Sequence, residues 1–85
     1  MSVYMNYYVL SPQGRKKFEE WQQIGITTGT QYKIIEYLYK KSAATVGQIA
    51  QETKLIPKEV ASQIEFFIQA GYLMTIEMYC SSINI

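Results

Sequence analysis

The apolar and polar positions at the start of the chain indicate a strand followed by a helix. Residues 3–10, VYMNYYVL, are rich in β-branched and aromatic side chains, which is typical of a strand. Ser11 can then accept a hydrogen bond from the free amides of a first helical turn, and Pro12 suits the first helical position because it has no N–H. We predict a helix over Pro12–Gln22, in which Gly14 weakens the first turn by up to ~1 kcal/mol relative to alanine.

A second helix is predicted after a linker of small and flexible residues, 25–30. Thr30 is expected to be its N-cap. Over Gln31–Lys41 the apolar residues fall on one stripe at helical spacing, and two lysines in the last turn complement the helix dipole. The stripe consists of Ile34, Ile35 and Leu38.

Two further helices are predicted on either side of a tight turn. Thr45 and Gln48 have the spacing of a capping box, so a short helix is expected to begin there and to run to about Thr53. Pro57 starts a longer helix after the turn, and Gly71 ends it in the position that a left-handed C-cap prefers. The apolar side of the longer helix carries Val60, Ile64, Phe67 and Ile68.

The chain returns to strand-forming residues after Gly71. The run LMTIEMYC, residues 73–80, contains no Gly, Asn or Asp at which a hairpin could turn, so we interpret it as one strand. We expect it to pair with residues 3–10 and to form a small antiparallel sheet from the two ends of the chain. With 85 residues, the whole chain (1–85) is predicted to be a single α+β domain.

Residues 45–73 resemble the winged helix-turn-helix family, in the style of the multiple-antibiotic-resistance regulators. Two helices joined by a few residues, the second of them longer and polar on its outer side, are typical of a helix-turn-helix. The resemblance implies a winged-helix-like three-helix core at about residues 30–76, with the helix before it and the terminal strands added. It depends on a threonine cap, on six apolar core positions and on a closing Gly-aromatic-Leu sequence. The cap is Thr45, the core positions are Ile49, Ala50, Leu55, Val60, Ile64 and Phe67, and the closing residues are Gly71, Tyr72 and Leu73.

The resemblance implies a function in binding double-stranded DNA, with the helix 57–70 in the major groove. The chain would then be a small sequence-specific transcriptional regulator. Gln63 can bind adenine through two hydrogen bonds, Lys58 suits guanine or phosphate, and Ser62 can contact several bases. Glu59 would repel phosphate unless it accepts from a cytosine amine. The expected DNA contacts are completed by Lys54 in the turn and Thr45 at the start of the preceding helix.

Several features depart from the family pattern, and the near-zero net charge, the acidic Glu59, the missing wing turn and the many aromatic residues favour an alternative, a winged-helix fold used for protein–protein interaction. The net charge is only +1, whereas DNA-binding domains usually have a basic excess. Ile56 stands where a Ser or Thr cap is usual, the recognition helix has no arginine, and no turn for a wing follows Leu73. Phe66 lies off the apolar stripe, and we expect it to pack within the chain rather than at a dimer interface.

Other classes of function are disfavoured by composition. The chain has no histidine and one cysteine, Cys80, so an intrachain disulfide is impossible and neither a zinc site nor a catalytic base–nucleophile pair is expected. No phosphate-binding glycine loop is present, and no cofactor is expected. No apolar run approaches the ~20 residues that span a bilayer, so we expect a cytoplasmic protein. A homodimer is expected because two recognition helices double the contacts with DNA.

Overall fold

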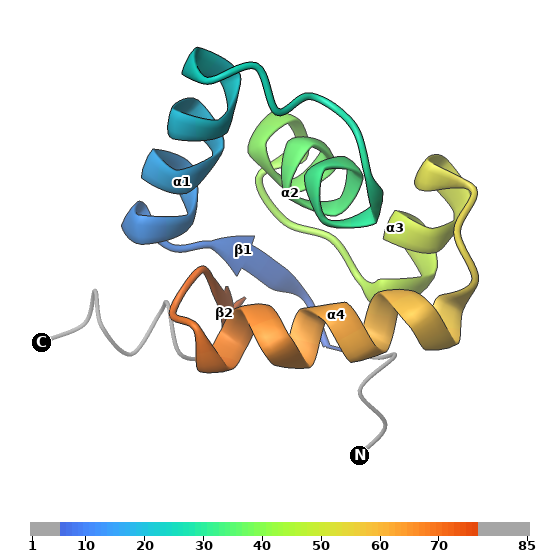
Figure 1. Cartoon of the computed structure of the whole chain (residues 1–85). Helices are drawn as coiled ribbons and strands as arrows, with labels where there is room; N and C mark the ends of the chain where they lie inside the picture. Colours follow the sequence, from blue (N-terminus) through green and yellow to red (C-terminus); the bar gives the residue numbers. More distant parts are fainter. Residues whose placement is uncertain (1–5, 77–85) are drawn as a thin grey trace, which may run out of the picture.

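Four helices and a two-stranded antiparallel sheet make up the part of the chain that the computed structural model describes, residues 6–76 (Figure 1). The α+β prediction is confirmed, as is the order of elements. The elements are β1 (Tyr8–Leu10), α1 (Pro12–Gln23), α2 (Thr30–Lys41), α3 (Val46–Thr53), α4 (Pro57–Gln69) and β2 (Leu73–Thr75).

The sheet joins the two ends of the described chain, as the sequence predicted. β1 and β2 are antiparallel, with Leu10 opposite Leu73 and Tyr8 opposite Thr75. The connection between α2 and α3 lies along the other side of β1, where Tyr8 N donates to Ala44 O at 2.8 Å and Ala44 N donates to Tyr8 O at 3.1 Å. Both strands are shorter than predicted: Asn6 and Tyr7 precede the strand, while residues 3–5 and 77–80 lie outside the described residues.

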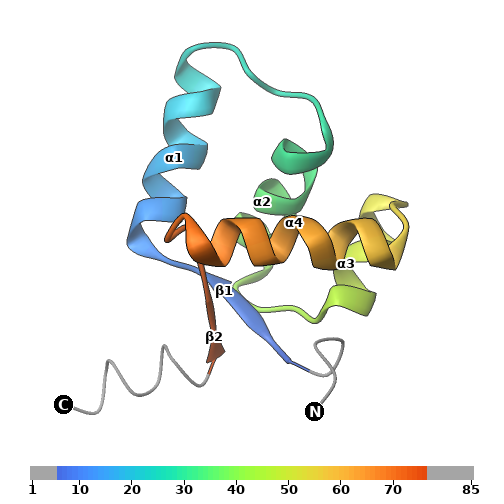
Figure 2. The same ribbon diagram turned by 60° about the horizontal axis from the view of Figure 1, so that its bottom comes forward.

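The core lies between α2, α3, α4 and the sheet. In Figures 1 and 2, α4 lies across α2 and α3, and α1 stands at the side of the molecule near the end of α4. The predicted apolar stripes all face inward. The fully buried side chains include Ile34, Ile35 and Leu38 from α2, Ile49 from α3, and Val60, Ile64 and Phe67 from α4.

Local capping signals gave two correct helix starts and one wrong one. The Ser11 hydroxyl accepts from Gly14 N at 3.0 Å, and the Thr45 capping box is complete. The prediction that Thr30 caps α2 was wrong, since Gly29 holds that position and Thr30 is the first helical residue. Gly29 has φ 104°, a conformation that suits glycine, and so the helix begins one residue earlier than expected.

At the junction between α1 and the end of α4, Gly14 lies very close to the backbone of Tyr72. A Cβ built on Gly14 would lie 2.1 Å from the carbonyl oxygen of Tyr72, so only glycine fits there. Ser11 completes the junction, because its N–H donates to Tyr72 O at 3.0 Å and its hydroxyl donates to Gly71 O at 2.5 Å. Gly14 therefore permits packing, which the sequence-based interpretation of a weakened helix had missed.

Phe66 corrects another expectation. Its side chain is 53% exposed, and its ring meets the edge of the Phe67 ring at 5.8 Å between centroids. The expectation that Phe66 packs inside the chain was wrong because Val60, Ile64 and Phe67 already fill the inner side of α4.

Candidate nucleic-acid interface

The turn between α3 and α4 is fixed by backbone conformation rather than by side-chain caps. Lys54 adopts the left-handed conformation (φ 61°, ψ 34°), and its N–H donates to Ala50 O. Leu55 N donates to the same carbonyl at 3.1 Å while the Leu55 side chain packs against the core. Ile56 has an extended backbone and gives α4 no side-chain cap, so Pro57 begins the helix without one. The chain thus reverses in three residues, and both lysines near the turn are left exposed.

The two sides of α4 differ in burial. Val60, Ile64 and Phe67 are completely buried on the inner side. No other described element lies over the opposite, outer side in Figure 2, where α4 crosses in front of α2 and α3. Lys58, Ser62 and Phe66 are exposed at successive i, i+4 positions and so form one row along the outer side.

Three of the predicted DNA contacts lie in the turn before α4 or in the N-terminal half of α4. Lys54, Lys58 and Ser62 are all exposed. Within residues 6–76, the salt bridges join Lys17 to Glu20 and Lys40 to Glu36, so neither Lys54 nor Lys58 is neutralised by a carboxylate. These two lysines make the start of α4 the basic end of the helix.

Two other predicted contacts, Glu59 and Gln63, are turned toward α2. The Thr30 hydroxyl donates to Glu59 Oε1 at 3.4 Å, and Gln31 Nε2 donates to Gln63 Oε1 at 3.1 Å. The structure therefore divides the four predicted residues of α4 into an outer pair, Lys58 and Ser62, and a pair beside the first turn of α2. Since Glu59 and Gln63 come directly before Val60 and Ile64, their closeness to the buried stripe was the sequence signal for this division.

Thr45 lies away from the other predicted contacts. Its hydroxyl accepts from Gln48 N at 3.2 Å, and its own N–H donates to Gln48 Oε1 at 3.0 Å. Thr45 and Lys54 flank opposite ends of α3, whose eight residues span about 12 Å at the usual helical rise. The hydroxyl therefore serves as the cap of α3 through an accepted hydrogen bond, and its O–H can still donate to a ligand.

The outer side of α4 also carries residues that the sequence reasoning had not assigned to a site. Glu65 is exposed one turn beyond Ser62, and Phe66 lies beside it. Ile56 is 65% exposed at the start of the helix. The outer side of α4 is thus basic at the start of the helix and carries an acidic and an aromatic side chain further along. Phe66 was recognisable in the sequence from its position off the apolar stripe.

Within residues 6–76, no three His, Cys, Asp or Glu side chains gather where they could hold a metal ion. No helix in that part of the chain is long and apolar enough to cross a membrane. Comparison of the chain with protein-family models, with curated proteins and with solved structures gave no match.

Proposed function

We propose that the protein binds double-stranded DNA in the manner of a winged helix-turn-helix regulator, with α4 in the major groove. The observation that carries this proposal is that Lys54 in the turn and Lys58 and Ser62 on α4 are exposed, with both lysines free of salt bridges. In helix-turn-helix proteins, the N-terminal residues of the second helix contact base edges. α3, the three-residue turn and α4 supply the corresponding elements.

The arrangement of the strands supports the winged-helix part of the proposal and accounts for the lack of a wing hairpin within residues 6–76. β1 lies between β2 and the Ala44 segment, so the N-terminal strand pairs where the second strand of a wing hairpin would return after β2. No hairpin then projects toward DNA from the described residues. One chain makes few contacts, and we propose a homodimer that uses two half-sites about 34 Å apart.

The surface of the dimer would involve the terminal strands. Ile76 N donates to Tyr7 O at 2.9 Å, so these two residues are cross-strand neighbours, and both of their apolar side chains are exposed. Sedimentation equilibrium would show a dimer for the unchanged protein and a monomer for Tyr7→Lys. A monomer in both cases would contradict this surface.

The proposed contacts have different roles. Lys54 would bind phosphate, whereas Lys58 and Ser62 would reach phosphate or base edges. To bind an adenine, Gln63 would exchange its hydrogen bond with Gln31 for hydrogen bonds to the base. To accept from a cytosine amine, Glu59 would likewise give up its hydrogen bond with Thr30. Readout by Gln63 or Glu59 would therefore change the contacts between α4 and α2, whereas readout by Lys58 or Ser62 would leave them intact.

The first test is binding to random-sequence duplex DNA at increasing salt. Two phosphate contacts per chain, and so four per dimer, predict that log K falls against log salt with a slope of about −3.6. Lys58→Glu should abolish binding, while Lys16→Glu on α1 makes the same charge change away from α4 and should retain it. Equal loss in both variants would indicate attraction by total charge alone, and no binding of the folded protein at low salt would overturn the proposal.

A second candidate function, protein–protein recognition through α4, is favoured by the exposed Phe66 and the adjacent Glu65. Aromatic residues are enriched at the energetic centres of such interfaces. This candidate would require Phe66→Ser to abolish association with the partner, and the affinity would change little with salt. Under the DNA proposal, Phe66→Ser leaves DNA affinity nearly unchanged.

A further inference from the structure

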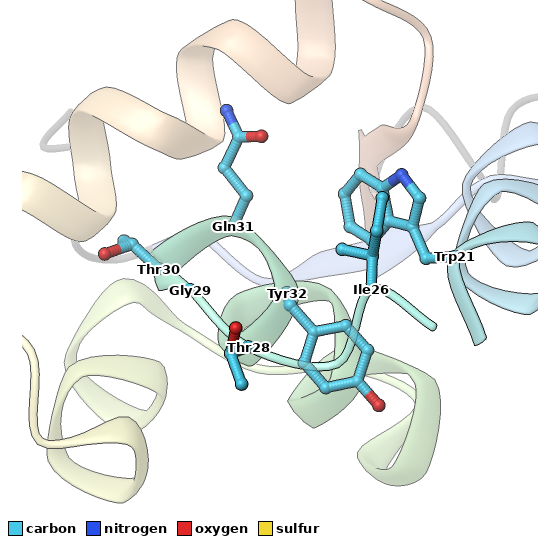
Figure 3. Close-up of a pocket in the computed structure, with 7 residues that line it drawn as sticks. All are labelled: Trp21, Ile26, Thr28, Gly29, Thr30, Gln31 and Tyr32. Carbon is cyan, nitrogen blue, oxygen red and sulfur yellow. The ribbon is translucent and has the colours of Figure 1, made fainter. Parts of the chain in front are cut away.

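A cavity of about 400 Å³ lies where the linker between α1 and α2 turns back on the molecule, and its volume falls within the ~300–1,000 Å³ typical of ligand pockets. The hydrogen bond from Ile26 N to Trp21 O, 2.8 Å long, folds the linker over the end of α1. This bond brings the Ile26 side chain next to Trp21 (Figure 3). The cavity is lined by Trp21, Ile26, Thr28, Gly29, Thr30, Gln31 and Tyr32.

The lining selects for an uncharged aromatic molecule. None of the lining side chains is charged, so an ionic ligand would lose its hydration without a partner. Trp21 and Tyr32 supply aromatic surface, and Ile26 supplies aliphatic surface that is 44% exposed. Thr28, Thr30 and Gln31 offer hydroxyl and amide groups that can both donate and accept. A planar ring with one neutral polar group matches these features.

The same cavity is connected to α4 by two hydrogen bonds. Thr30 and Gln31 line the cavity, and their side chains also donate to Glu59 and Gln63. Figure 3 shows Gln31 directed toward α4, on the other side of the cavity from the Tyr32 ring. A ligand that accepts a hydrogen bond from the Thr30 hydroxyl or from Gln31 Nε2 therefore competes with the bonds that these groups donate to Glu59 and Gln63.

The linker has room to adjust to a ligand. Gly25 (φ 83°) and Gly29 (φ 104°) flank the cavity segment, and no atom lies within 4 Å of a Cβ built on either of them. The space beside these two glycines is therefore open.

We propose that this cavity binds a small uncharged aromatic molecule and that binding is transmitted to α4 through Thr30 and Gln31. The binding step is independent of the DNA proposal, because it concerns α1, the linker and α2. The transmitted change would affect DNA affinity only if α4 contacts DNA.

The test uses benzamide as the probe and two-dimensional ¹H–¹⁵N NMR of the whole chain as the readout. Trp21 is the single tryptophan, so its indole N–H gives one unambiguous resonance. Benzamide should shift this resonance, the Thr30 amide and the side-chain amides of Gln31 and Gln63. Benzoate should bind at least several-fold more weakly because the cavity has no cation. No shift of the lining resonances at saturating benzamide would overturn the proposal.

Matched variants separate the cavity from the exposed linker in general. Ile26→Glu replaces the aliphatic part of the lining with a hydrated carboxylate and should weaken benzamide binding ~10-fold or more, because the apolar contact with the ring is lost. Ile24→Glu makes the same change at a position that is 64% exposed and outside the lining, and it should leave binding unchanged. Equal weakening in both variants would overturn the assignment to this cavity.

Gln31→Leu tests the transmission to α4 and does not depend on DNA. Gln31 is exposed, so the variant is expected to fold. Benzamide should bind more weakly because Gln31 also lines the cavity, but at saturation it should still shift the Trp21 indole resonance, whereas the Gln63 side-chain amide should no longer respond. A response of Gln63 that is unchanged in Gln31→Leu would contradict the proposed route. Failure of the DNA proposal would leave all of these spectra as expected.

Discussion

The two ends of α4 are held in different ways. At the C-terminal end, Gly71 and Tyr72 meet α1 through two hydrogen bonds from Ser11 and through the close approach of Gly14. At the N-terminal end, Ile56 provides no cap, and Lys54 and Lys58 are exposed. The C-terminal end therefore restricts which residues fit, whereas the N-terminal end does not. Substitutions at the N-terminal end should change function with little effect on folding.

The largest effect is expected from Gly14→Ala at the C-terminal end. The added methyl group would overlap the Tyr72 carbonyl, which belongs to the backbone and cannot move without displacing the end of α4. We expect a loss of about 1–3 kcal/mol or more in the free energy of unfolding, measured by urea denaturation.

Gly47→Ala is the matched control for that substitution. Gly47 is also in a helix, but the nearest atom to a Cβ there is Thr45 Oγ1 at 3.9 Å. The variant should be neutral or up to ~1 kcal/mol more stable, because alanine favours the helix. Destabilisation of the same size in both variants would remove the special role of the junction.

Ser11→Ala should have the next largest effect. It removes the cap of α1 and leaves the Gly71 carbonyl without its hydroxyl donor, so we expect a loss of about 1–2 kcal/mol. Ser62→Ala makes the same change on the outer side of α4, and thermal denaturation should place it within ~0.5 kcal/mol of the unchanged protein. A neutral Ser11→Ala would mean that the C-terminal end of α4 is no more constrained than the outer side.

Ile56→Ser should stabilise the N-terminal end by about 0.5–1 kcal/mol. The backbone at Ile56 (φ −73°, ψ 131°) already has the extended conformation of an N-cap, and a serine hydroxyl could accept from the free amides of α4. Ile24→Ser, at a similarly exposed residue that ends α1, provides the control and should have little effect. An unchanged denaturation midpoint for Ile56→Ser would show that the first turn of α4 needs no cap.

The smallest effect is a loss of stability at alkaline pH. The pKa of Lys17 is raised above its usual 10.5, first by its hydrogen bond to Glu20, and its ammonium group also lies 5.8 Å from the Tyr72 ring centroid. A raised pKa favours the folded state while the lysine is charged. This contribution is present below pH 10.5 and disappears as the pH rises through the folded pKa.

An NMR titration of the Lys17 side chain in the unchanged protein and in Glu20→Gln measures this effect directly, and the substitution should lower the pKa. Stability curves alone would not suffice, because Tyr39 deprotonates in the same range. Its pKa is raised above 10.0, first by its hydrogen bond to Glu19. An identical Lys17 pKa in both proteins would remove Glu20 as the cause.

The candidate site was only partly predictable from the sequence. Exposure of Lys58 and Ser62 followed from their places opposite the apolar stripe of α4. The contacts of Glu59 with Thr30 and of Gln63 with Gln31 did not, because these partners are 29 and 32 residues apart in the chain. The position of Phe66 off that stripe was also visible in the sequence, but only the structure showed that no other described element covers it.

The sequence by itself determined those features that neighbouring residues control. The Ser11 and Thr45 caps join groups three positions apart, and the apolar stripes follow the period of the helix. Tertiary structure alone decided the requirement for glycine at position 14 and the cavity beside Trp21. The physical reason is that local hydrogen bonds depend on short spacings, whereas close approach and shared contacts depend on how helices distant in the chain pack against one another.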